Sequence, residues 1–317
     1  MGLRSKFRGC LLGLAVGDAV GTTLEFRRRG SFTPLTDMVG GGPFGLEAGQ
    51  WTDDTSMALC LATSLLERGG FDPRDQMERY CRWSQEGYLS STGTCFDIGA
   101  TVAAALRRYR QDGDPFAGSA DPWAAGNGSL MRLAPVPLFY FPDLNLAEQF
   151  AVESSRTTHA AEECLDAARF LARAIGRALA GAGRNEVLLG DAEGFQGCAS
   201  IVALARGDYR GKAESQVRGS GYVVESLEAA LWCFAHSRSF AEAVLKAANL
   251  GDDADTTAAI CGQLAGAFYG ESAIPPAWLE KLAMDQEIRA LADRLLAAGP
   301  GRAEALLIDT LVSDSPD

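Results

Sequence analysis

Two clusters of carboxylate and hydroxyl side chains are the residues of this sequence best suited to chemistry. Residues 51–55 read Trp-Thr-Asp-Asp-Thr and residues 251–257 read Gly-Asp-Asp-Ala-Asp-Thr-Thr, and each cluster stands directly before an apolar stretch with helical spacing. A single aspartate is enough to cap a helix. Two or three carboxylates within a few residues repel one another unless a cation or the helix N-terminus offsets their charge. Each cluster alone fits helix capping, whereas two clusters of the same pattern favour a shared cation site.

The oxygen ligands in these clusters are typical of a hard cation. Aspartate and threonine oxygens, completed by water, suit Mg²⁺ or Mn²⁺ rather than a soft metal. The sequence holds only two histidines, and its eight cysteines form no C-x-x-C pair, so a zinc site is not expected. Two hard cations about 3.5–4 Å apart are a common device for activating water and holding substrate oxygens.

Further segments carry side chains that could contact a substrate. Glu25 lies between a leucine and a phenylalanine, a setting that fits either a partly buried acid or an ordinary exposed glutamate. Residues 126–132, Gly-Asn-Gly-Ser-Leu-Met-Arg, predict either a turn or backbone N–H groups presented to a phosphate or ribose. Residues 219–222, Gly-Ser-Gly-Tyr, predict a loop whose tyrosine could stack on a base. His159 opens a long helical stretch, where a capping or core histidine is the ordinary interpretation.

The composition is that of a globular protein with an acidic surplus. Of its 317 residues, 47% are hydrophobic and 22% are charged, which is enough to bury a sizeable core. The formal net charge of −12 argues against nucleic-acid binding by phosphate neutralisation. We find no stretch apolar enough for a membrane span and no signal-cleavage pattern. The scattered cysteines indicate reduced core residues, so we expect a cytoplasmic protein, and we expect a monomer.

Helical spacing dominates the chain. We expect helices over residues 55–67, 98–110, 146–154, 160–180, 224–235, 240–248, 256–269, 286–298 and 302–312, and another opened by Asp72 and Pro73. Residues 136–140 are the best strand candidate, although Pro135 and Pro137 interrupt them. No linker or repeat divides the sequence. The prediction is an all-α fold, a single domain over residues 1–317 built as a multi-layer helical bundle.

Two features of this bundle should help to shape a site. Gly9, Gly13 and Gly17 recur at four-residue steps on the first helix and would let another helix approach closely. Long loops are expected over residues 27–50, 112–128 and 206–222. Loops of that length in a compact domain are usually either functional or disordered.

The order of the motifs resembles that of the ADP-ribosylglycohydrolase family, which includes the dinitrogenase reductase-activating glycohydrolase. The resemblance runs from Gly9 to about Gly270. Its parts, in the family's order, are Gly17-Asp18-Ala19 with Glu25, Trp51-Thr52-Asp53-Asp54-Thr55, Phe96-Asp97-Ile98-Gly99, Gly126-Asn127-Gly128-Ser129-Leu130-Met131-Arg132, Thr158-His159, Gly221-Tyr222-Val223-Val224 and Asp253-Ala254-Asp255-Thr256. Several parts are weak individually, and the complete ordered set is highly specific.

This resemblance implies an all-α fold with a dinuclear Mg²⁺ or Mn²⁺ centre in a cleft. The implied metal ligands are Thr52, Asp53, Asp54, Asp253, Asp255 and Thr256. Glu25 and Asp97 match family acids near the metals and the scissile ribose, which implies catalytic roles for both. The residues implied to line the ADP-ribose groove are Asn127, Gly128, Ser129, Met131, His159, Gly219, Gly221 and Tyr222. Asp252 stands where the family often has a glycine.

The implied function is metal-dependent cleavage of the glycosidic bond between ADP-ribose and a protein side chain, with arginine as the expected acceptor. Such cleavage needs an acid or electrophile on one side of the sugar and water on the other. We expect Glu25 or Asp97 to orient or deprotonate that water. Two alternatives stay open: a hydrolase directed at serine-linked or O-acetyl-ADP-ribose, and a module that binds ADP-ribose without cleaving it. A structural protein similar to J1-type lens crystallins is disfavoured because the metal carboxylates are present.

Overall fold

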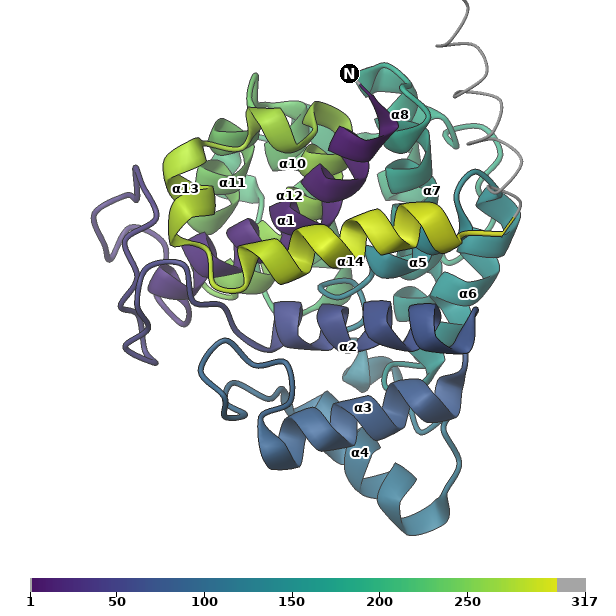
Figure 1. Cartoon of the computed structure of the whole chain (residues 1–317). Helices are drawn as coiled ribbons and strands as arrows, with labels where there is room; N and C mark the ends of the chain where they lie inside the picture. Colours follow the sequence, from purple (N-terminus) through teal and green to yellow (C-terminus); the bar gives the residue numbers. More distant parts are fainter. Residues whose placement is uncertain (1, 301–317) are drawn as a thin grey trace, which may run out of the picture.

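The computed structural model of the chain describes residues 2–300, which form helices joined by loops (Figure 1). The α-helices are α1 (Leu3–Gly21), α2 (Asp53–Arg68), α3 (Pro73–Glu86), α4 (Ala100–Asp112), α5 (Pro135–Tyr140), α6 (Leu144–Arg156), α7 (Glu162–Leu179), α8 (Arg184–Leu189), α9 (Ala199–Arg206), α10 (Val223–Ala235), α11 (Phe240–Ala248), α12 (Ala254–Tyr269), α13 (Pro276–Lys281) and α14 (Asp285–Ala298). The 3₁₀ helices are η1 (Thr22–Leu24), η2 (Pro122–Ala124), η3 (Asp208–Gly211), η4 (Glu214–Gln216) and η5 (Glu271–Ala273). Within residues 2–300 there is no β-sheet, only three isolated bridges, so the all-α prediction is confirmed.

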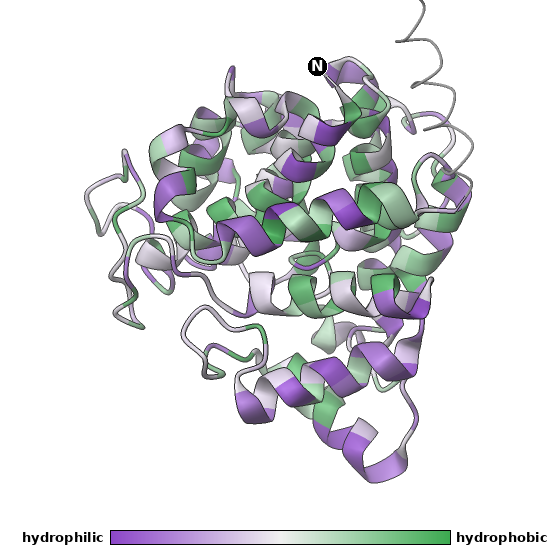
Figure 2. Ribbon diagram, in the orientation of Figure 1, coloured by the Kyte–Doolittle hydropathy of each residue, from purple (hydrophilic) through white to green (hydrophobic). Residues whose placement is uncertain are grey.

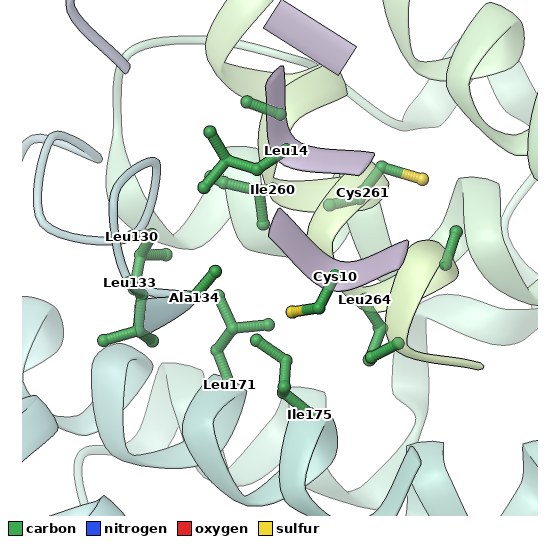
Figure 3. Packing of buried hydrophobic residues seen from close by; sticks show 14 of the residues in the cluster. Cys10, Leu14, Leu130, Leu133, Ala134, Leu171, Ile175, Ile260, Cys261 and Leu264 are labelled. Atoms are coloured by element: carbon green, nitrogen blue, oxygen red, sulfur yellow. The ribbon is translucent and has the colours of Figure 1, made fainter. Parts of the chain in front are cut away.

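The helix α1 occupies the centre of the molecule, with α12 beside it and α14 crossing in front (Figure 1). Both α1 and α12 are apolar on nearly every side, and such helices are stable only when they are buried all round. Figure 3 shows Cys10 of α1 among side chains of α12 and α7, including Leu264 and Ile175. The large core of the protein therefore forms around α1.

Glycines set the distance between α1 and α12. A Cβ atom on Gly13 would lie 2.3 Å from the carbonyl oxygen of Gly262, and a Cβ on Gly17 would lie 2.2 Å from that of Ala258. Real side chains do not approach backbone atoms this closely, so any larger residue would push the helices apart. The predicted close approach is confirmed. It places the C-terminal end of α1 directly against the start of α12.

A second, smaller hydrophobic cluster lies between α2, α3 and α4. Its largest buried side chains are Tyr80 and Trp83 of α3, which pack with Met57 and Cys60 of α2 and with Leu106 of α4. The other buried side chains of α2 belong to the large core, so α2 stands between the two clusters. Hydrophilic and hydrophobic residues alternate around the turns of α3 and α14 (Figure 2), as expected for helices with one solvent-facing side.

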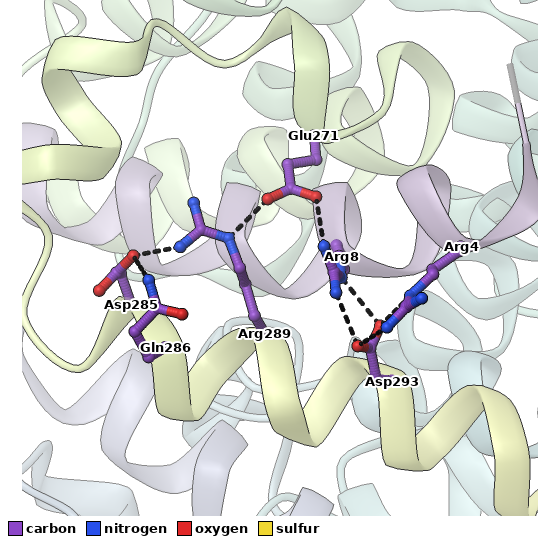
Figure 4. Close-up of polar contacts among 7 residues, drawn as sticks. All are labelled: Arg4, Arg8, Glu271, Asp285, Gln286, Arg289 and Asp293. Atoms are coloured by element: carbon purple, nitrogen blue, oxygen red, sulfur yellow. Dashed lines mark hydrogen bonds and ion pairs between the residues drawn. The ribbon is translucent and has the colours of Figure 1, made fainter.

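A network of ion pairs fastens α14 across α1 (Figure 4). The guanidinium groups of Arg4 and Arg8, on α1, both contact the Asp293 carboxylate of α14, with 2.7 Å between Arg8 Nη2 and Asp293 Oδ2. Arg8 and Arg289 also contact Glu271 of η5, the second through a hydrogen bond of 2.6 Å. Shared partners of this kind hold long side chains in place better than isolated surface pairs do. The network fixes the outer end of α1.

The predicted helices agree with the observed ones to within about two residues at each end for the long elements. Asp72 accepts hydrogen bonds from two backbone N–H groups at the start of α3, as its predicted capping role requires. The strand candidate at residues 136–140 is wrong, because this segment is α5. Pro135 and Pro137 lie in the first turn of α5, where a proline replaces N–H groups that have no helical partner.

Shorter elements escaped the sequence patterns. The helices α8, α9 and α13 were not predicted, and the helix expected over residues 302–312 lies outside the described residues. The eight cysteines are all free, and five of them are buried. Among the described helices, none combines the length and the apolar character that a membrane crossing requires.

Candidate metal centre and substrate cleft

The two acidic clusters of the sequence meet where α2 and α12 begin. Asp54 accepts a hydrogen bond from Thr52 at 3.1 Å within the first cluster, and the Thr256 hydroxyl of the second cluster lies 3.5 Å from the same Asp54 oxygen. Carboxylate oxygens of Asp54 and Asp255, from opposite clusters, lie within 4.8 Å of each other. Segments some two hundred residues apart in the sequence therefore form one group of oxygen ligands.

Neither cluster caps its own helix. The N-terminal residues of α2 and α12, Thr52 and Asp253, make no side-chain capping hydrogen bond. Instead, Asp18 of α1 accepts hydrogen bonds from the backbone N–H groups of Thr52 and Thr55 at 2.9 and 3.1 Å, and from both hydroxyls. Glu25 accepts one from the backbone N–H of Ala254 at 2.8 Å. Asp18 and Glu25 thus hold both helix starts from outside the two clusters.

The donor set fits a hard cation. The Asp54 Oδ1 atom is fully buried and has no hydrogen-bond partner, an arrangement that costs free energy unless a ligand completes it. Burial raises the pKa values of Asp53, Asp54 and Asp255 well above their usual range, and their mutual repulsion adds to the effect. Buried, unpaired carboxylates with hydroxyl oxygens beside them are ligands that Mg²⁺ and Mn²⁺ prefer. These residues can therefore hold a metal ion.

The two predicted catalytic acids lie beside this cluster and are also perturbed. Burial raises the pKa of the Glu25 carboxyl to about 8, and the negative charges of Asp253 and Asp97 push it the same way. Burial likewise raises the pKa of Asp97 to about 6. Perturbed carboxyl groups gathered in one cleft are typical of a catalytic site.

A cavity of about 330 Å³ opens above the acidic cluster. The predicted site residues that line it are Glu25, Asp53, Asp97, Asn127, Gly128, Met131, His159, Gly221, Asp253, Asp255 and Thr256. Its lining includes five carboxylate side chains and neither a lysine nor an arginine. Any positive charge opposite these carboxylates must come from a bound ion or from a ligand.

Five of the predicted site residues do not line this cavity, and one of them, Tyr222, lines the adjoining cavity described below. Thr52 and Asp54 are buried beneath its floor. Ser129 is buried with no hydrogen-bond partner for its hydroxyl oxygen. The carbonyl oxygen of Gly219 accepts a hydrogen bond from the Asp253 backbone N–H at 2.9 Å, so this glycine helps to position the second cluster.

Asn127 has a similar positioning contact. Its amide nitrogen donates to the Asp253 carboxylate at 2.9 Å and to the Ser226 hydroxyl at 3.2 Å. The backbone N–H of Asn127 also donates to the carbonyl of Gly221 at 3.1 Å. These bonds hold the segment around residue 127 against the segment around residue 221, so two predicted binding loops lie side by side.

His159 borders the cavity as a neutral ring. Arg132 donates a hydrogen bond of 2.7 Å to the Thr158 hydroxyl oxygen, and this hydroxyl lies 2.8 Å from His159 Nδ1. A Thr158 proton donated to Nδ1 would place the ring proton on Nε2. Burial and the Arg132 charge lower the pKa of His159 to about 3. Gly128 leaves room for this ring, since a Cβ there would lie 2.8 Å from His159 Cε1.

A second cavity of about 670 Å³ adjoins the first and shares Thr101, Gly126 and Gly221 with it. Tyr222, as predicted, stands on the surface here and donates a hydrogen bond of 2.7 Å to Glu163. The other side carries Trp123, whose residue surface is 97% exposed. Sequence reasoning did not single out Trp123. Its position inside the loop predicted over residues 112–128 was the available signal.

Backbone geometry accounts for Asp252. This residue has a φ of 58°, in the left-handed region that glycine adopts freely and aspartate tolerates better than most residues. Its carbonyl accepts a hydrogen bond from the Phe26 N–H at 2.8 Å, and its own N–H donates to the Arg27 carbonyl at 2.8 Å. Phe26 and Asp97 also have positive φ values, of 62° and 55°. Three unusual backbone conformations thus lie around the cavity.

The chain is similar to known proteins over most of its length. The family model described as ADP-ribosylglycohydrolase matches residues 1–305. The chain is 46% identical to the ADP-ribosylarginine hydrolase Tri1 of Pseudomonas putida (strain GB-1), over 93% of this chain and 79% of that protein. It is 34% identical to the ADP-ribosyl-[dinitrogen reductase] glycohydrolase of Rhodospirillum rubrum, over 91% of this chain and 95% of that protein.

The fold agrees as well. A solved structure titled ADP-ribosylglycohydrolase-related protein complex superposes with a TM-score of 0.82 at 44% identity, over 93% of this chain and 98% of that one. Likeness of this extent includes the sequence, the helical architecture and nearly the full length of both chains. The chain therefore belongs to the ADP-ribosylglycohydrolase family, a family of glycosidic hydrolases.

Proposed function

We propose that this protein hydrolyses the N-glycosidic bond between ADP-ribose and an arginine side chain of a modified protein, with two divalent cations, Mg²⁺ or Mn²⁺. The observation that carries the proposal is the meeting of both acidic clusters beneath one cavity, with a buried Asp54 oxygen that lacks a partner. The relatives named as an ADP-ribosylarginine hydrolase and an ADP-ribosyl glycohydrolase support the choice of substrate.

The proposed metal ligands are Thr52, Asp53, Asp54, Asp253, Asp255 and Thr256. Bound hard cations would supply positive charge for the ribose hydroxyls and lower the pKa of a water. Asp18 is not proposed as a ligand, because both of its carboxylate oxygens already accept hydrogen bonds from the start of α2. Asn127 and Gly219 would keep Asp253 in place.

Glu25 and Asp97 are the proposed catalytic acids. One oxygen of Glu25 accepts a hydrogen bond from the Ala254 N–H, which fixes the carboxyl group at the cavity beside Asp253 and Asp255. Asp97 lines the same cavity. In the proposed reaction one of these carboxylates takes the proton of the attacking water, and the acceptor guanidine leaves with a proton.

The rest of the cleft would bind ADP-ribose. His159 presents a neutral Nε2–H donor beside the glycines at residues 126–128, which suits a ribose or phosphate oxygen. In the adjoining cavity the exposed rings of Tyr222 and Trp123 would flank the adenine base. We also propose that the protein acts as a monomer in the cytoplasm, a setting in which its eight free cysteines stay reduced.

A panel of substrates tests this function. Arginine-linked, serine-linked and O-acetyl-ADP-ribose would each be assayed with Mg²⁺, with Mn²⁺ and with a chelator. We expect the fastest turnover on the arginine-linked substrate, and no turnover with the chelator. Glu25→Gln and Asp97→Asn should each lower kcat by at least about 100-fold. If both variants keep full activity, the catalytic assignment is wrong.

A second function, ADP-ribose binding without cleavage, is tested on the same protein. Calorimetry with ADP-ribose in the presence and absence of Mn²⁺ measures binding independently of turnover. Tight binding with no hydrolysis of any substrate in the panel would favour a binding module, although the perturbed carboxyls of Glu25 and Asp97 have no evident use in such a protein.

A further inference from the structure

Three phenylalanines from separate segments pack against one another, and one of them, Phe26, lines the first cavity. Phe26 follows η1, Phe44 belongs to the loop before α2, and Phe96 belongs to the loop between α3 and α4. The ring centroids of Phe26 and Phe44 are 6.2 Å apart, and those of Phe44 and Phe96 are 5.3 Å apart. The two loops lie on the same side of the molecule, at the left in Figure 1. We call these three residues the aromatic wall.

The exposed end of the wall faces the cavity. Phe26 lines the cavity next to Glu25, yet 66% of its residue surface remains exposed. Phe96 directly precedes Asp97 in the chain, so each end of the wall adjoins one of the proposed catalytic acids.

The charge around the wall suits a cation. The cavity has five carboxylates in its lining and neither lysine nor arginine. Two nearby guanidinium groups are bonded elsewhere, because Arg27 donates to the carbonyl of Ser31 and Arg29 donates to the carbonyls of Glu214 and Leu250. An aromatic face beside carboxylates attracts a planar cation through its quadrupole and through the neighbouring charges.

The position of the wall also identifies which part of a substrate reaches it. At Thr101, Gly126 and Gly221 the cavity continues into the second cavity, which Tyr222 and Trp123 line. If the nucleotide extends in that direction from the metal cluster, the group on the far side of the scissile bond emerges beside Phe26. That group is the acceptor side chain.

We propose that the aromatic wall is the acceptor subsite, and that Phe26 selects a guanidinium by a cation–π contact. This inference builds on the proposed function and specifies how that function distinguishes arginine from an uncharged acceptor such as serine. Serine-linked and O-acetyl substrates have no cation to place on the ring, so they gain nothing from it.

The backbone keeps the Phe26 ring in place. Phe26, in its left-handed conformation, donates its N–H to the Asp252 carbonyl, the Asp252 N–H donates to the Arg27 carbonyl, and the Phe26 ring makes an edge-to-face contact with Phe44. A side chain held in position before binding loses little conformational freedom when a ligand arrives. Asp252 and Phe44 would therefore act as positioning residues for the subsite.

The first experiment compares acceptor selectivity in Phe26 variants. Phe26→Leu keeps an apolar side chain and removes the π system, whereas Phe26→Tyr keeps both. Phe26→Leu should lower kcat/KM for the arginine-linked substrate by about 3- to 30-fold and leave kcat/KM for O-acetyl-ADP-ribose within about twofold. Phe26→Tyr should stay close to wild type on both substrates.

A second readout compares two inhibitors of the same reaction. L-arginine and L-citrulline have nearly the same shape, and only arginine carries the cationic guanidinium. Arginine should inhibit wild-type hydrolysis as a product analogue at lower concentration than citrulline does, and Phe26→Leu should reduce this difference by the same 3- to 30-fold factor. Phe116→Leu is the matched control, because Phe116 has the Arg156 guanidinium 4.6 Å from its ring centre and is not part of the cavity lining.

The outcomes separate this inference from the proposed function. If wild-type protein cleaves the arginine-linked substrate and Phe26→Leu slows both substrates equally, or slows neither, the acceptor subsite is wrong and the function stands. If wild-type protein cleaves only uncharged acceptors, the proposed arginine specificity fails. Equal inhibition by arginine and citrulline in the wild type would also overturn the subsite.

Discussion

Asp18 holds the start of α2 although it belongs to α1. Its buried carboxylate accepts hydrogen bonds from two backbone N–H groups and two hydroxyls of Thr52 and Thr55. In Asp18→Asn one of these acceptor oxygens becomes an NH₂ group that faces donors. With Mn²⁺ present at neutral pH, we expect this variant to lose about 2–4 kcal/mol of unfolding free energy, measured by chemical denaturation.

A matched substitution separates this effect from the loss of any capping aspartate. Asp143 accepts two backbone N–H groups at the exposed start of α6, and asparagine caps an exposed helix about as well as aspartate does. Asp143→Asn should therefore change the unfolding free energy by less than about 0.5 kcal/mol. Equal losses in the two variants would contradict the special role assigned to Asp18.

His159 should remain neutral throughout the physiological pH range. Burial and the nearby Arg132 lower its pKa to about 3, and the Thr158 hydroxyl lies 2.8 Å from Nδ1. In NMR spectra of the ring nitrogens we expect the Nε2–H form and no titration between pH 5 and pH 8, the window in which an ordinary histidine changes charge. A titration midpoint near 6.5 would show that the Arg132–Thr158 arrangement does not control the ring.

Spacing along the chain made part of the site predictable. The two Asp/Thr clusters were visible because adjacent carboxylates before a helix exceed what a cap requires. Asp18 carried no role in the sequence, since its partners lie more than thirty residues away on another helix. Phe26 and Trp123 sit in loops without periodicity, so only the folded chain shows that they border the cavities.

At the scale of elements, the contact between α1 and α12 brings Asp18 and Glu25 to the two helix starts. Gly17→Ala tests it. Alanine has the better helix propensity by about 1 kcal/mol, but its Cβ would lie 2.2 Å from the Ala258 carbonyl oxygen. We expect a net loss of about 2–4 kcal/mol in unfolding free energy, measured by chemical denaturation, together with weaker Mn²⁺ binding by calorimetry.

Gly176→Ala is the control for this substitution. A Cβ on Gly176 of α7 would also be close to a neighbour, at 2.2 Å, but that neighbour is the end of the flexible Leu144 side chain. Leu144 can change rotamer, whereas a helix backbone cannot move without its whole helix. A smaller loss of stability is expected for Gly176→Ala, and Mn²⁺ affinity should be unchanged. If Gly17→Ala is no more harmful than this control, the helix contact is not the constraint we describe.

The apolar patterns of the helices show why some helices could be predicted and others could not. Helices such as α7 and α11 carry periodic apolar patterns with clear ends, and their ranges were found closely. In α5 the pattern is only six residues long and begins with prolines, so periodicity could not separate a buried strand from a short helix. Tertiary burial, which the sequence does not display locally, decided the outcome.

At the scale of the whole molecule, the acidic cluster opposes folding when no cation is bound. Burial raises the pKa values of Glu25 to about 8 and of Asp18 to about 6, above those of exposed acids. The folded protein therefore holds protons that the unfolded chain releases. Stability from these groups is present at low pH and is lost as pH rises through 6 and 8.

This linkage predicts how stability responds to metal and pH together. In the presence of a chelator, the Tm of the wild type should decrease as the pH rises from 6 to 8. Mn²⁺ should raise Tm more at pH 8 than at pH 6, because the ion supplies the positive charge that the ionised carboxylates lack. The measurement is a thermal unfolding series with chelator and with Mn²⁺. A metal-induced rise that is equal at both pH values would contradict the linkage.

The substitution Asp54→Asn tests how the acidic cluster itself affects thermal stability. The variant removes one buried, repelling charge whose Oδ1 has no partner, so with chelator at pH 8 it should unfold at a Tm about 2–6 °C above the wild type. It should also lose most of the stabilisation by Mn²⁺, because a ligand is gone. If the variant is more stable than the wild type without metal and gains less stability from Mn²⁺, the acidic cluster lowers the stability of the metal-free protein in order to bind a cation. A variant that is less stable than the wild type without metal, yet still stabilised by Mn²⁺, would assign Asp54 a structural role instead.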